Sequence, residues 1–227
     1  MSAFTPFGWG DVSFMLEGAL VTLALCAVAV VLGCAVALPV GILRTLPGAR
    51  PVNAAALLYI ELFRSTPLLL QLFVVYFGLS IFGFDVPRSL AAGVTMTLYA
   101  SAYLGEIVRA GIQAVARGQW EAASSHGLSY AQQLRWIVLP QAIRVILPSA
   151  VGFLVGLIKA SSLTSIIGFL ELSRVARIVV ERTMSSFTVF GLVAVVYFLM
   201  CYPLSLLGLR LERRLGRGQG APASRWA

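Results

Sequence analysis

The chain has 227 residues, of which 59% are hydrophobic and only 11% are charged. This composition excludes an ordinary soluble domain, in which about a quarter of the residues carry a charge. The formal net charge of +8 is typical of a membrane protein whose basic residues determine its orientation. It does not require a nucleic-acid partner.

Five apolar segments are long enough, or nearly long enough, to cross a bilayer as helices. About 20 apolar residues span roughly 30 Å of hydrocarbon. Backbone polar groups must be satisfied within the membrane, and these segments lack the alternation of barrel strands. We therefore predict an all-α membrane protein with a single domain, residues 1–215. The five predicted transmembrane helices cover approximately residues 16–43, 55–83, 88–110, 145–170 and 186–210.

The first two spans differ in their polar content. The first is too long for the apolar core of a cleavable signal peptide and lacks a cationic region before it, so we expect it to be retained. The second carries Glu61 and Arg64 near its inner end, where the i, i+3 spacing favours a local ion pair. Gln71 lies deeper in the same apolar run and is a candidate contact for a translocated molecule.

The third span carries polar and aromatic side chains on one helical face. Tyr99, Tyr103 and Glu106 follow one another at intervals of four and three residues, so they share a face. Ionisable groups inside a membrane are costly and usually functional. We expect this face to point into the helix bundle, where Glu106 either contacts a translocated molecule or forms a structural pair.

A polar segment, residues 113–144, separates the third span from the fourth. Gln119–His126 favours a short helix, and Gly127 is typical of the left-handed residue that follows a helix end. Tyr130–Val138 predicts a second, amphipathic helix, which Leu139–Pro140 is expected to break. The polar segment therefore predicts a compact knob outside the membrane. An ordinary loop with a capped helix is the plainer alternative.

The fourth span is predicted to begin near Pro148, because proline suits the first turn of a helix. Lys159 lies about 22 Å from Arg144 along a helix that rises about 1.5 Å per residue. That depth is too great for the side chain to reach the cytoplasm easily, so Lys159 is a candidate path residue, as is the nearby Ser161. The amphipathic stretch Glu171–Ser186 is expected to lie on the membrane surface or over a pore.

Basic residues predict the orientation of the chain, because Lys and Arg are enriched in cytoplasmic loops. The polar segment and the C-terminus are expected in the cytoplasm and the N-terminus outside. The tail, residues 216–227, is rich in Gly, Pro and Ser and is predicted to be disordered. The basic residues that determine this orientation are Arg44, Arg50, Arg64, Arg109, Arg117, Arg135, Arg144, Arg210, Arg213, Arg214, Arg217 and Arg225.

No residue pattern predicts an active site, a metal site or a resident cofactor. The sequence offers no Ser/His/Asp or paired-carboxylate set. A phosphate-binding loop needs Gly-Lys-Ser/Thr, and the one lysine, Lys159, follows an isoleucine. Cys26, Cys34 and Cys201 lie in apolar runs, where disulfides and metal clusters are not expected. The single histidine, His126, is expected to be exposed or to lie in an interface.

Several short motifs occur in a defined order along the chain. They are Gly18–Leu23, Tyr59–Gln71, Tyr76–Leu79, Ala102–Ile112, Gly118-Gln119, Glu121-Ala122-Ala123, Gly127 and Leu139–Arg144. Together they resemble the inner-membrane permeases of binding-protein-dependent ABC importers, in the polar amino-acid subfamily. The motif around Glu121 and Gly127 is similar to the EAA loop of these permeases. Each motif alone is weak, but the set is specific and covers nearly the whole chain.

The resemblance implies a permease subunit that moves a polar amino acid across a bacterial inner membrane. A coupling helix in the polar segment would sit in a separate ATPase subunit. The implied partners are two ATPase subunits that use ATP and Mg, a second permease subunit, identical or paralogous, and a periplasmic amino-acid-binding protein. The chain itself would bind no cofactor. The implied ATPase-coupling residues are Glu121, Ala122, Ala123, Gly127 and Leu128.

Two other functions compete with this interpretation: an ATP-independent membrane carrier and a membrane assembly scaffold. A carrier of that kind does not need the polar segment. The chain also departs from the subfamily pattern, because Lys159-Ala160-Ser161-Ser162 stands where Lys-Asp-Thr-Ser is usual. This subunit therefore either holds a substrate site or contributes half of a shared pathway. The candidate substrate-path residues are Gln71, Tyr99, Tyr103, Glu106, Lys159 and Ser161.

Overall fold

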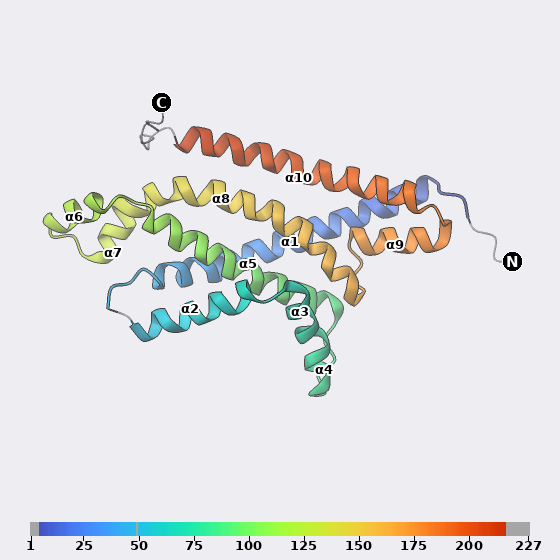
Figure 1. Ribbon diagram of the computed structural model, residues 1–227, viewed down its shortest axis with the longest axis horizontal. Coiled ribbons are helices and arrows are strands. Elements are labelled where there is room, and N and C mark those ends of the chain that lie inside the picture. Colours follow the sequence, from blue (N-terminus) through green and yellow to red (C-terminus); the bar gives the residue numbers. More distant parts are fainter. Residues whose placement is uncertain (1–4, 49, 217–227) are drawn as a thin grey trace, which may run out of the picture.

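The computed structural model describes residues 5–48 and 50–216, and every regular element within these ranges is a helix (Figure 1). The predicted all-α class is confirmed for this part of the chain. The longest helices run side by side along the long axis of the molecule. The predicted disordered tail lies outside the described residues, except for Gly216, which ends the last helix.

The first helix, α1 (Trp9–Leu43), packs along α5 (Arg88–Gln113) at the centre of the molecule. Small residues permit the close approach, as is common between membrane helices. A Cβ atom built on Gly41 would lie only 2.6 Å from the carbonyl oxygen of Gly105. The helix α1 begins earlier than the predicted residue 16, because the Asp11 carboxylate accepts a hydrogen bond from the Gly8 N–H at 3.0 Å and caps its first turn.

The predicted second span is a bent structure. Helix α2 (Arg50–Ser65) is followed by α3 (Leu68–Phe73), the π-helical turn η1 (Val74–Gly78) and the short α4 (Leu79–Ile81), with a bend of 101°. The predicted span over residues 55–83 is therefore not one continuous helix, and its path across the membrane remains a prediction. Pro67 lacks an N–H and disfavours a helical conformation in the residue before it. The segment α3–α4 consequently projects away from the bundle (Figure 1).

The polar segment leads into the fourth long helix without the predicted break. It contains α6 (Arg117–Ser125), α7 (Tyr130–Gln133) and the π-helical turn η2 (Leu134–Val138). The chain continues directly into α8 (Leu139–Ala160) and the 3₁₀ helix η3 (Ser161–Ile167).

Two prolines lie within this continuous helical stretch, contrary to the sequence prediction. Pro140 does not end the helix and Pro148 lies in the interior of α8. The missing N–H and the ring of Pro140 conflict with an ordinary α-helical turn before it. The wider π-helical turn η2 lies at that place and accommodates the proline.

The last two helices are α9 (Leu172–Thr183) and α10 (Ser186–Gly216). Val175 and Val179 of α9 are buried against Met15 of α1 and against α10. The buried Glu171 carboxylate accepts hydrogen bonds from the first N–H groups of α9, at 3.0 Å from Ser173 and 2.9 Å from Arg174. Burial raises the pKa of Glu171 above its ordinary value, against the effect of these backbone hydrogen bonds.

Among the described residues, three helical stretches are long and apolar enough to cross a membrane, and a fourth is added if the bent pair counts as one span. They are Trp9–Leu43, Tyr130–Ile167 and Ser186–Leu215. The helix α5 is not among them, because many of its residues are small or polar and pack against α1, α2 and α8. Its 26 residues still measure about 39 Å, so a fifth span remains a prediction.

Candidate functional site

A short exposed helix forms the outermost part of the polar segment. The helix α6 ends as predicted, because Gly127 has a left-handed φ of +73°. The N–H of Gly127 donates to the Ser124 carbonyl at 2.9 Å, and the N–H of Leu128 donates to the Ala123 carbonyl at 3.3 Å. These two bonds form the usual reversal at a helix end and satisfy carbonyls that would otherwise lack partners. The result is a rigid knob at one end of the molecule (Figure 1).

The residues predicted to contact an ATPase fall on two sides of this knob. Glu121, Ala122 and Gly127 are exposed, whereas Ala123 is buried and Leu128 is half-buried. The Glu121 carboxylate accepts a hydrogen bond from Nε of Arg117 at 2.8 Å, and both side chains remain open to solvent. Such an exposed pair contributes little to stability. Three of the five residues are therefore presented outward, and Ala123 holds the helix to the rest of the protein.

Aromatic packing and side-chain hydrogen bonds fix the knob on the helix that follows it. The rings of Trp120 and Tyr130 stack with their centroids 5.6 Å apart. The buried Gln133 amide donates to Ser124 Oγ at 3.1 Å and to the Leu128 carbonyl at 2.7 Å. A buried cluster beneath joins α5 to this region and to α8. It contains Val108, Ile112, Val115, Leu134, Val138 and Ala142.

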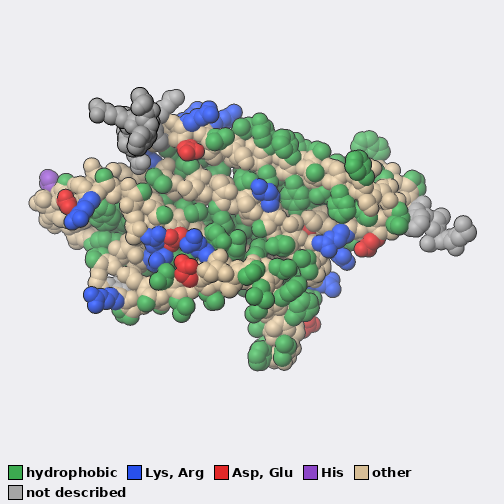
Figure 2. Space-filling view, in the orientation of Figure 1, with side chains coloured by type: hydrophobic (Ala, Val, Ile, Leu, Met, Phe, Trp, Pro, Cys, Tyr) green, Lys and Arg blue, Asp and Glu red, His purple; other side chains and the backbone are tan. Residues whose placement is uncertain are grey.

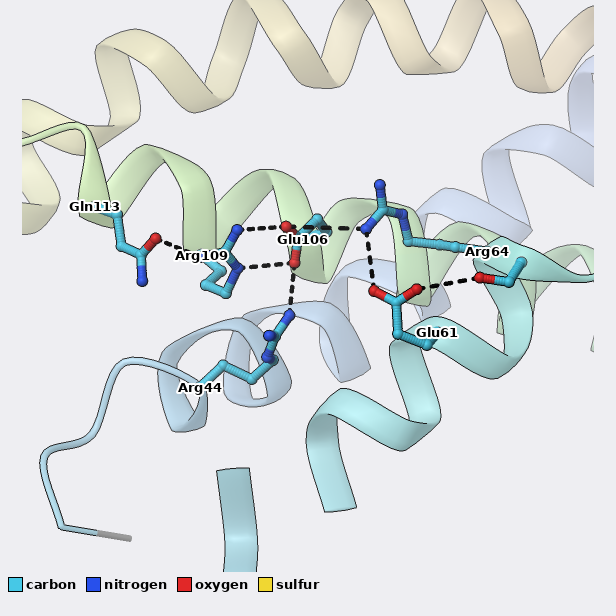
Figure 3. Close-up of polar contacts among 7 residues, drawn as sticks. Arg44, Glu61, Arg64, Glu106, Arg109 and Gln113 are labelled. Carbon is cyan, nitrogen blue, oxygen red and sulfur yellow. Dashed lines mark hydrogen bonds and ion pairs between the residues drawn. The ribbon is translucent and has the colours of Figure 1, made fainter. Parts of the chain in front are cut away.

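A second polar feature, which we call the Glu106 cluster, joins the adjacent ends of α1, α2 and α5. It consists of Arg44, Glu61, Arg64, Glu106 and Arg109, and Figure 3 shows the arginines pointing toward Glu106. Blue and red side chains gather in one patch on this face of the molecule (Figure 2).

The distances in the Glu106 cluster define strong and weak contacts. The Glu106 carboxylate lies 2.7 Å from Arg44 and is held by both Nε and the terminal nitrogen of Arg109, with the Nε contact at 2.8 Å. Such paired, charge-assisted hydrogen bonds are the strong type. Arg64 lies farther away, at 3.9 Å from Glu106 and 3.8 Å from Glu61.

An aromatic group extends the cluster along α5. The Tyr99 and Tyr103 rings lie 4.6 Å apart, and the Tyr103 ring stacks on Phe153 of α8 at 5.4 Å. The Arg64 guanidinium lies over the Tyr103 ring at 5.4 Å, within the range of a cation–π interaction. The structure therefore brings together the predicted face Tyr99, Tyr103 and Glu106, and adds the arginine from α2.

The other three candidate path residues have different surroundings. The Gln71 amide donates to the carbonyls of Phe63 and Thr66 at 2.8 and 3.1 Å, so it closes the bend before α3. Ser161 is fully buried and donates to the Ile158 carbonyl. Lys159 is exposed on α8. Within the described part of the chain, no hydrogen bond or ion pair joins any of the three to the Glu106 cluster.

Sequence reasoning missed two sets of contacts that organise this site: those of Glu106 with its arginine partners, and that of Tyr130. The partnership of Glu106 with Arg109 has a readable signal, because the two residues are three apart on one helix. The contact with Arg44 has no such signal, since 62 residues separate the two. The second missed contact joins Tyr130 to Thr45, 85 residues apart. The predicted pair of Glu61 and Arg64 is present, but only at 3.8 Å.

The fold and the exposed knob define a class: an all-helical membrane protein that presents a short, rigid helix at one end. Residues 29–217 match the family described as "binding-protein-dependent transport system inner membrane component". The chain belongs to this family. The match includes the polar segment and all the residues of the Glu106 cluster.

Curated relatives from Bacillus subtilis (strain 168) cover most of the chain. The probable glutamine ABC transporter permease protein GlnM is 39% identical over 73% of this chain and 77% of its own length. The arginine transport system permease protein ArtQ is 34% identical over 90% of this chain and 94% of its own length.

Solved structures support the same relationship. A chain from the crystal structure of an amino acid ABC transporter with histidines is 37% identical, with a TM-score of 0.84 over 89% of this chain and 94% of that chain. A chain of the inward-facing MetNI methionine ABC transporter has a TM-score of 0.76 at 23% identity, over 92% of this chain and 99% of that chain. The second match shows a shared fold only.

Proposed function

We propose that this chain is the permease subunit of an ATP-driven ABC importer that carries a polar amino acid across a bacterial inner membrane. One observation carries the proposal: a member of this family exposes Glu121, Ala122 and Gly127 on a rigid helix outside its apolar bundle. A helix in that place can fit a groove of a motor subunit. The relatives named for glutamine and arginine transport support an amino acid as the cargo.

The proposed assembly contains two ATPase subunits, a second permease subunit and a periplasmic amino-acid-binding protein. ATP and Mg are used by the ATPase subunits, and this chain contributes no catalytic residue. The helix α6 and the C-terminal end of α10 lie in the cytoplasm, and the N-terminus lies in the periplasm. The placement of basic residues supports this orientation.

The proposed substrate path follows the aromatic face of α5. Tyr99 and Tyr103 offer rings and hydroxyls beside Arg64, whose cation lies over the Tyr103 ring. Ring faces and a guanidinium suit the apolar, amide and carboxylate parts of an amino acid. Glu106 is already held by two arginines, so it shapes this end of the path. Lys159 offers a further cation on α8.

The test is ATP-dependent uptake by the assembled transporter in proteoliposomes. We expect uptake of a polar amino acid to require the ATPase subunits and the binding protein. Gly127→Val should uncouple ATP hydrolysis from uptake, because valine does not readily hold the φ of +73°. Gly127→Asn is the matched control, since asparagine tolerates this conformation and the space around the Cβ position is open.

Three outcomes would count against the proposal. Uptake that proceeds without the ATPase subunits would indicate an ATP-independent carrier. Normal uptake and normal substrate-stimulated ATPase activity in both Gly127→Val and Glu121→Ala would remove α6 from the coupling step. A complex that assembles with other membrane proteins but takes up no amino acid under any condition would favour a scaffold.

A further inference from the structure

We propose that Tyr130 and Thr45 form a relay that carries movement of α6 to the Glu106 cluster through the end of α1. The inference rests on the proposed function, because it concerns the step by which a motor bound at α6 acts on the membrane helices. Neither residue belongs to the set predicted to touch an ATPase. Both would be positioning residues that act through others.

The first step of the relay joins α6 to α7. Trp120 lies in α6, and its ring stacks on Tyr130 at a centroid distance of 5.6 Å and an interplanar angle of 20°. Gln133 ties the same turn to Ser124 and Leu128. Because these contacts combine a stacked pair with hydrogen bonds from a buried amide, α6 and the start of α7 are expected to move as one body.

The second step joins α7 to the end of α1. The Tyr130 hydroxyl lies 2.7 Å from Thr45 Oγ1 and donates to the Thr45 carbonyl at 3.0 Å. Thr45 Oγ1 also lies within hydrogen-bond distance of the Ile42 carbonyl, at 2.7 Å. The contact thus engages the last turn of α1, which has no other hydrogen bond or ion pair to the described residues 113–144.

The third step joins the end of α1 to α5 and α2. Arg44 directly precedes Thr45 in the chain and lies 2.7 Å from the Glu106 carboxylate. Glu106 is also held by Arg109 and lies near Arg64 (Figure 3). The Arg64 guanidinium lies over the Tyr103 ring. A displacement of Thr45 therefore acts on a cluster that holds three helices together, next to the proposed substrate path.

A separate apolar contact connects the polar segment to α5 and α8 directly, through residues such as Val138 and Ile112. That contact does not include Thr45 or Arg44, although Ile42 of the last turn of α1 also packs against it. Removing the Tyr130 hydroxyl should therefore leave the apolar contact and the Trp120 stack intact, and should remove only the hydrogen-bonded link to Thr45. The relay therefore predicts that ATP hydrolysis drives less uptake, while the subunits of the transporter still assemble.

The experiment compares Tyr130→Phe with wild type in the complete transporter, and measures uptake, ATP hydrolysis, subunit assembly and thermal stability. We expect the number of molecules taken up per ATP to fall about two- to tenfold, as the loss of one net hydrogen bond would allow. Assembly and basal ATP hydrolysis should be retained. Thr45→Val is a second variant that removes only Oγ1 and should have a smaller effect in the same direction.

Tyr202→Phe is the matched control, because Tyr202 lies exposed on α10 and its hydroxyl forms no hydrogen bond to the described residues.

The double variant Tyr130→Phe, Arg44→Gln should lose no more uptake per ATP than Arg44→Gln alone, since both changes interrupt one route. If the fold loss of uptake per ATP in the double variant equalled the product of the two single losses, the relay would be overturned. An unchanged uptake per ATP in Tyr130→Phe would also overturn it. A proportional loss of uptake, hydrolysis and assembly would also overturn it in favour of a plain anchor. Wild type without ATP-dependent uptake would instead overturn the proposed function.

Discussion

Glu106 and Glu171 are carboxylates with contrasting surroundings. Glu106 lies among three arginines at the junction of three helices. Glu171 is fully buried and accepts hydrogen bonds from backbone N–H groups and from the Tyr197 hydroxyl at 3.3 Å. Because burial raises the pKa of Glu171, we expect this residue to make the stability of the protein depend on pH.

The sign of that dependence follows from proton binding. The native pKa of Glu171 lies above its ordinary value of 4.5, so the native state holds the proton over a range in which the unfolded chain has lost it. The stabilising contribution is full below the ordinary value and is lost as the pH rises through the native pKa. We expect the melting temperature of wild type, relative to Glu171→Gln, to fall as the pH rises from about 4 toward neutrality.

Thermal unfolding of both proteins in detergent, at a series of pH values, measures this difference. Glu181→Gln controls for the loss of one exposed carboxylate on the same helix. A difference between wild type and Glu171→Gln that is constant with pH would contradict the expectation. The N-capping hydrogen bonds alone would lower the native pKa of Glu171, and the melting temperature of wild type relative to Glu171→Gln would then rise with pH.

At the scale of elements, the pairing of α1 with α5 depends on glycine. A Cβ atom at Gly41 would meet the Gly105 carbonyl oxygen at 2.6 Å and the Val108 side chain at 2.8 Å. A main-chain oxygen cannot move away as the end of a flexible side chain can. We expect Gly41→Ala to lower the free energy of unfolding by about 1–3 kcal/mol through overpacking, measured by thermal or denaturant unfolding.

The control for this prediction is Gly93→Ala on α5, where no atom lies within 4 Å of the added Cβ. Alanine favours a helix over glycine by about 1 kcal/mol, so Gly93→Ala should be neutral or stabilising. If Gly41→Ala lowered the free energy of unfolding and Gly93→Ala did not, the close approach of α1 and α5 would explain the difference. If Gly41→Ala stabilised the protein as much as Gly93→Ala, the tight α1–α5 contact would be disproved.

Three prolines show how far the elements could be predicted from the sequence. No bend was predicted at Pro67, yet the chain turns by 101° there. A break was expected at Pro140 and a helix start at Pro148, yet both lie in continuous helix. Proline removes one backbone hydrogen-bond donor at each of these positions. Whether the helix continues depends on the contacts around each proline, such as the hydrogen bonds of Gln71 that close the bend, and the presence of a proline alone does not reveal them.

In the candidate site too, features within one helix were predictable from the sequence, and contacts between distant parts of the chain were not. The helix ended by Gly127 and the shared face of Tyr99, Tyr103 and Glu106 were predictable, because both depend on spacing within one helix. The Arg44 contact with Glu106 and the Tyr130 contact with Thr45 bring together distant parts of the chain. Single-sequence periodicity carries no information about such pairs.

At the scale of the whole molecule, the two ends should face opposite sides of the membrane. Ser125 ends α6 and Ser186 begins α10, and Figure 1 shows α6 and the start of α10, next to α9, at opposite ends of the molecule. In a variant without the native cysteines, Ser186→Cys should react with a membrane-impermeant thiol reagent in right-side-out vesicles. Ser125→Cys should react only in inside-out vesicles.

Each variant serves as the control for the other, because both carry one exposed cysteine. The expected pattern agrees with the orientation proposed from the basic residues. Labelling of both cysteines from the same side would contradict that orientation. It would also mean that Tyr130–Ile167 does not cross the membrane, although this stretch is long and apolar enough to do so.

The unbroken run of helix from Tyr130 to Ile167 has a geometrical consequence. Its 38 residues measure roughly 57 Å at about 1.5 Å per residue, nearly twice the roughly 30 Å hydrocarbon core of a bilayer. In a rigid helix of this length, a small tilt produces a large displacement of both tips. Tilting it by about 10° around its middle shifts each tip by about 5 Å, close to one helical turn. A slight rocking of the rod can therefore open a passage of molecular width at its far tip.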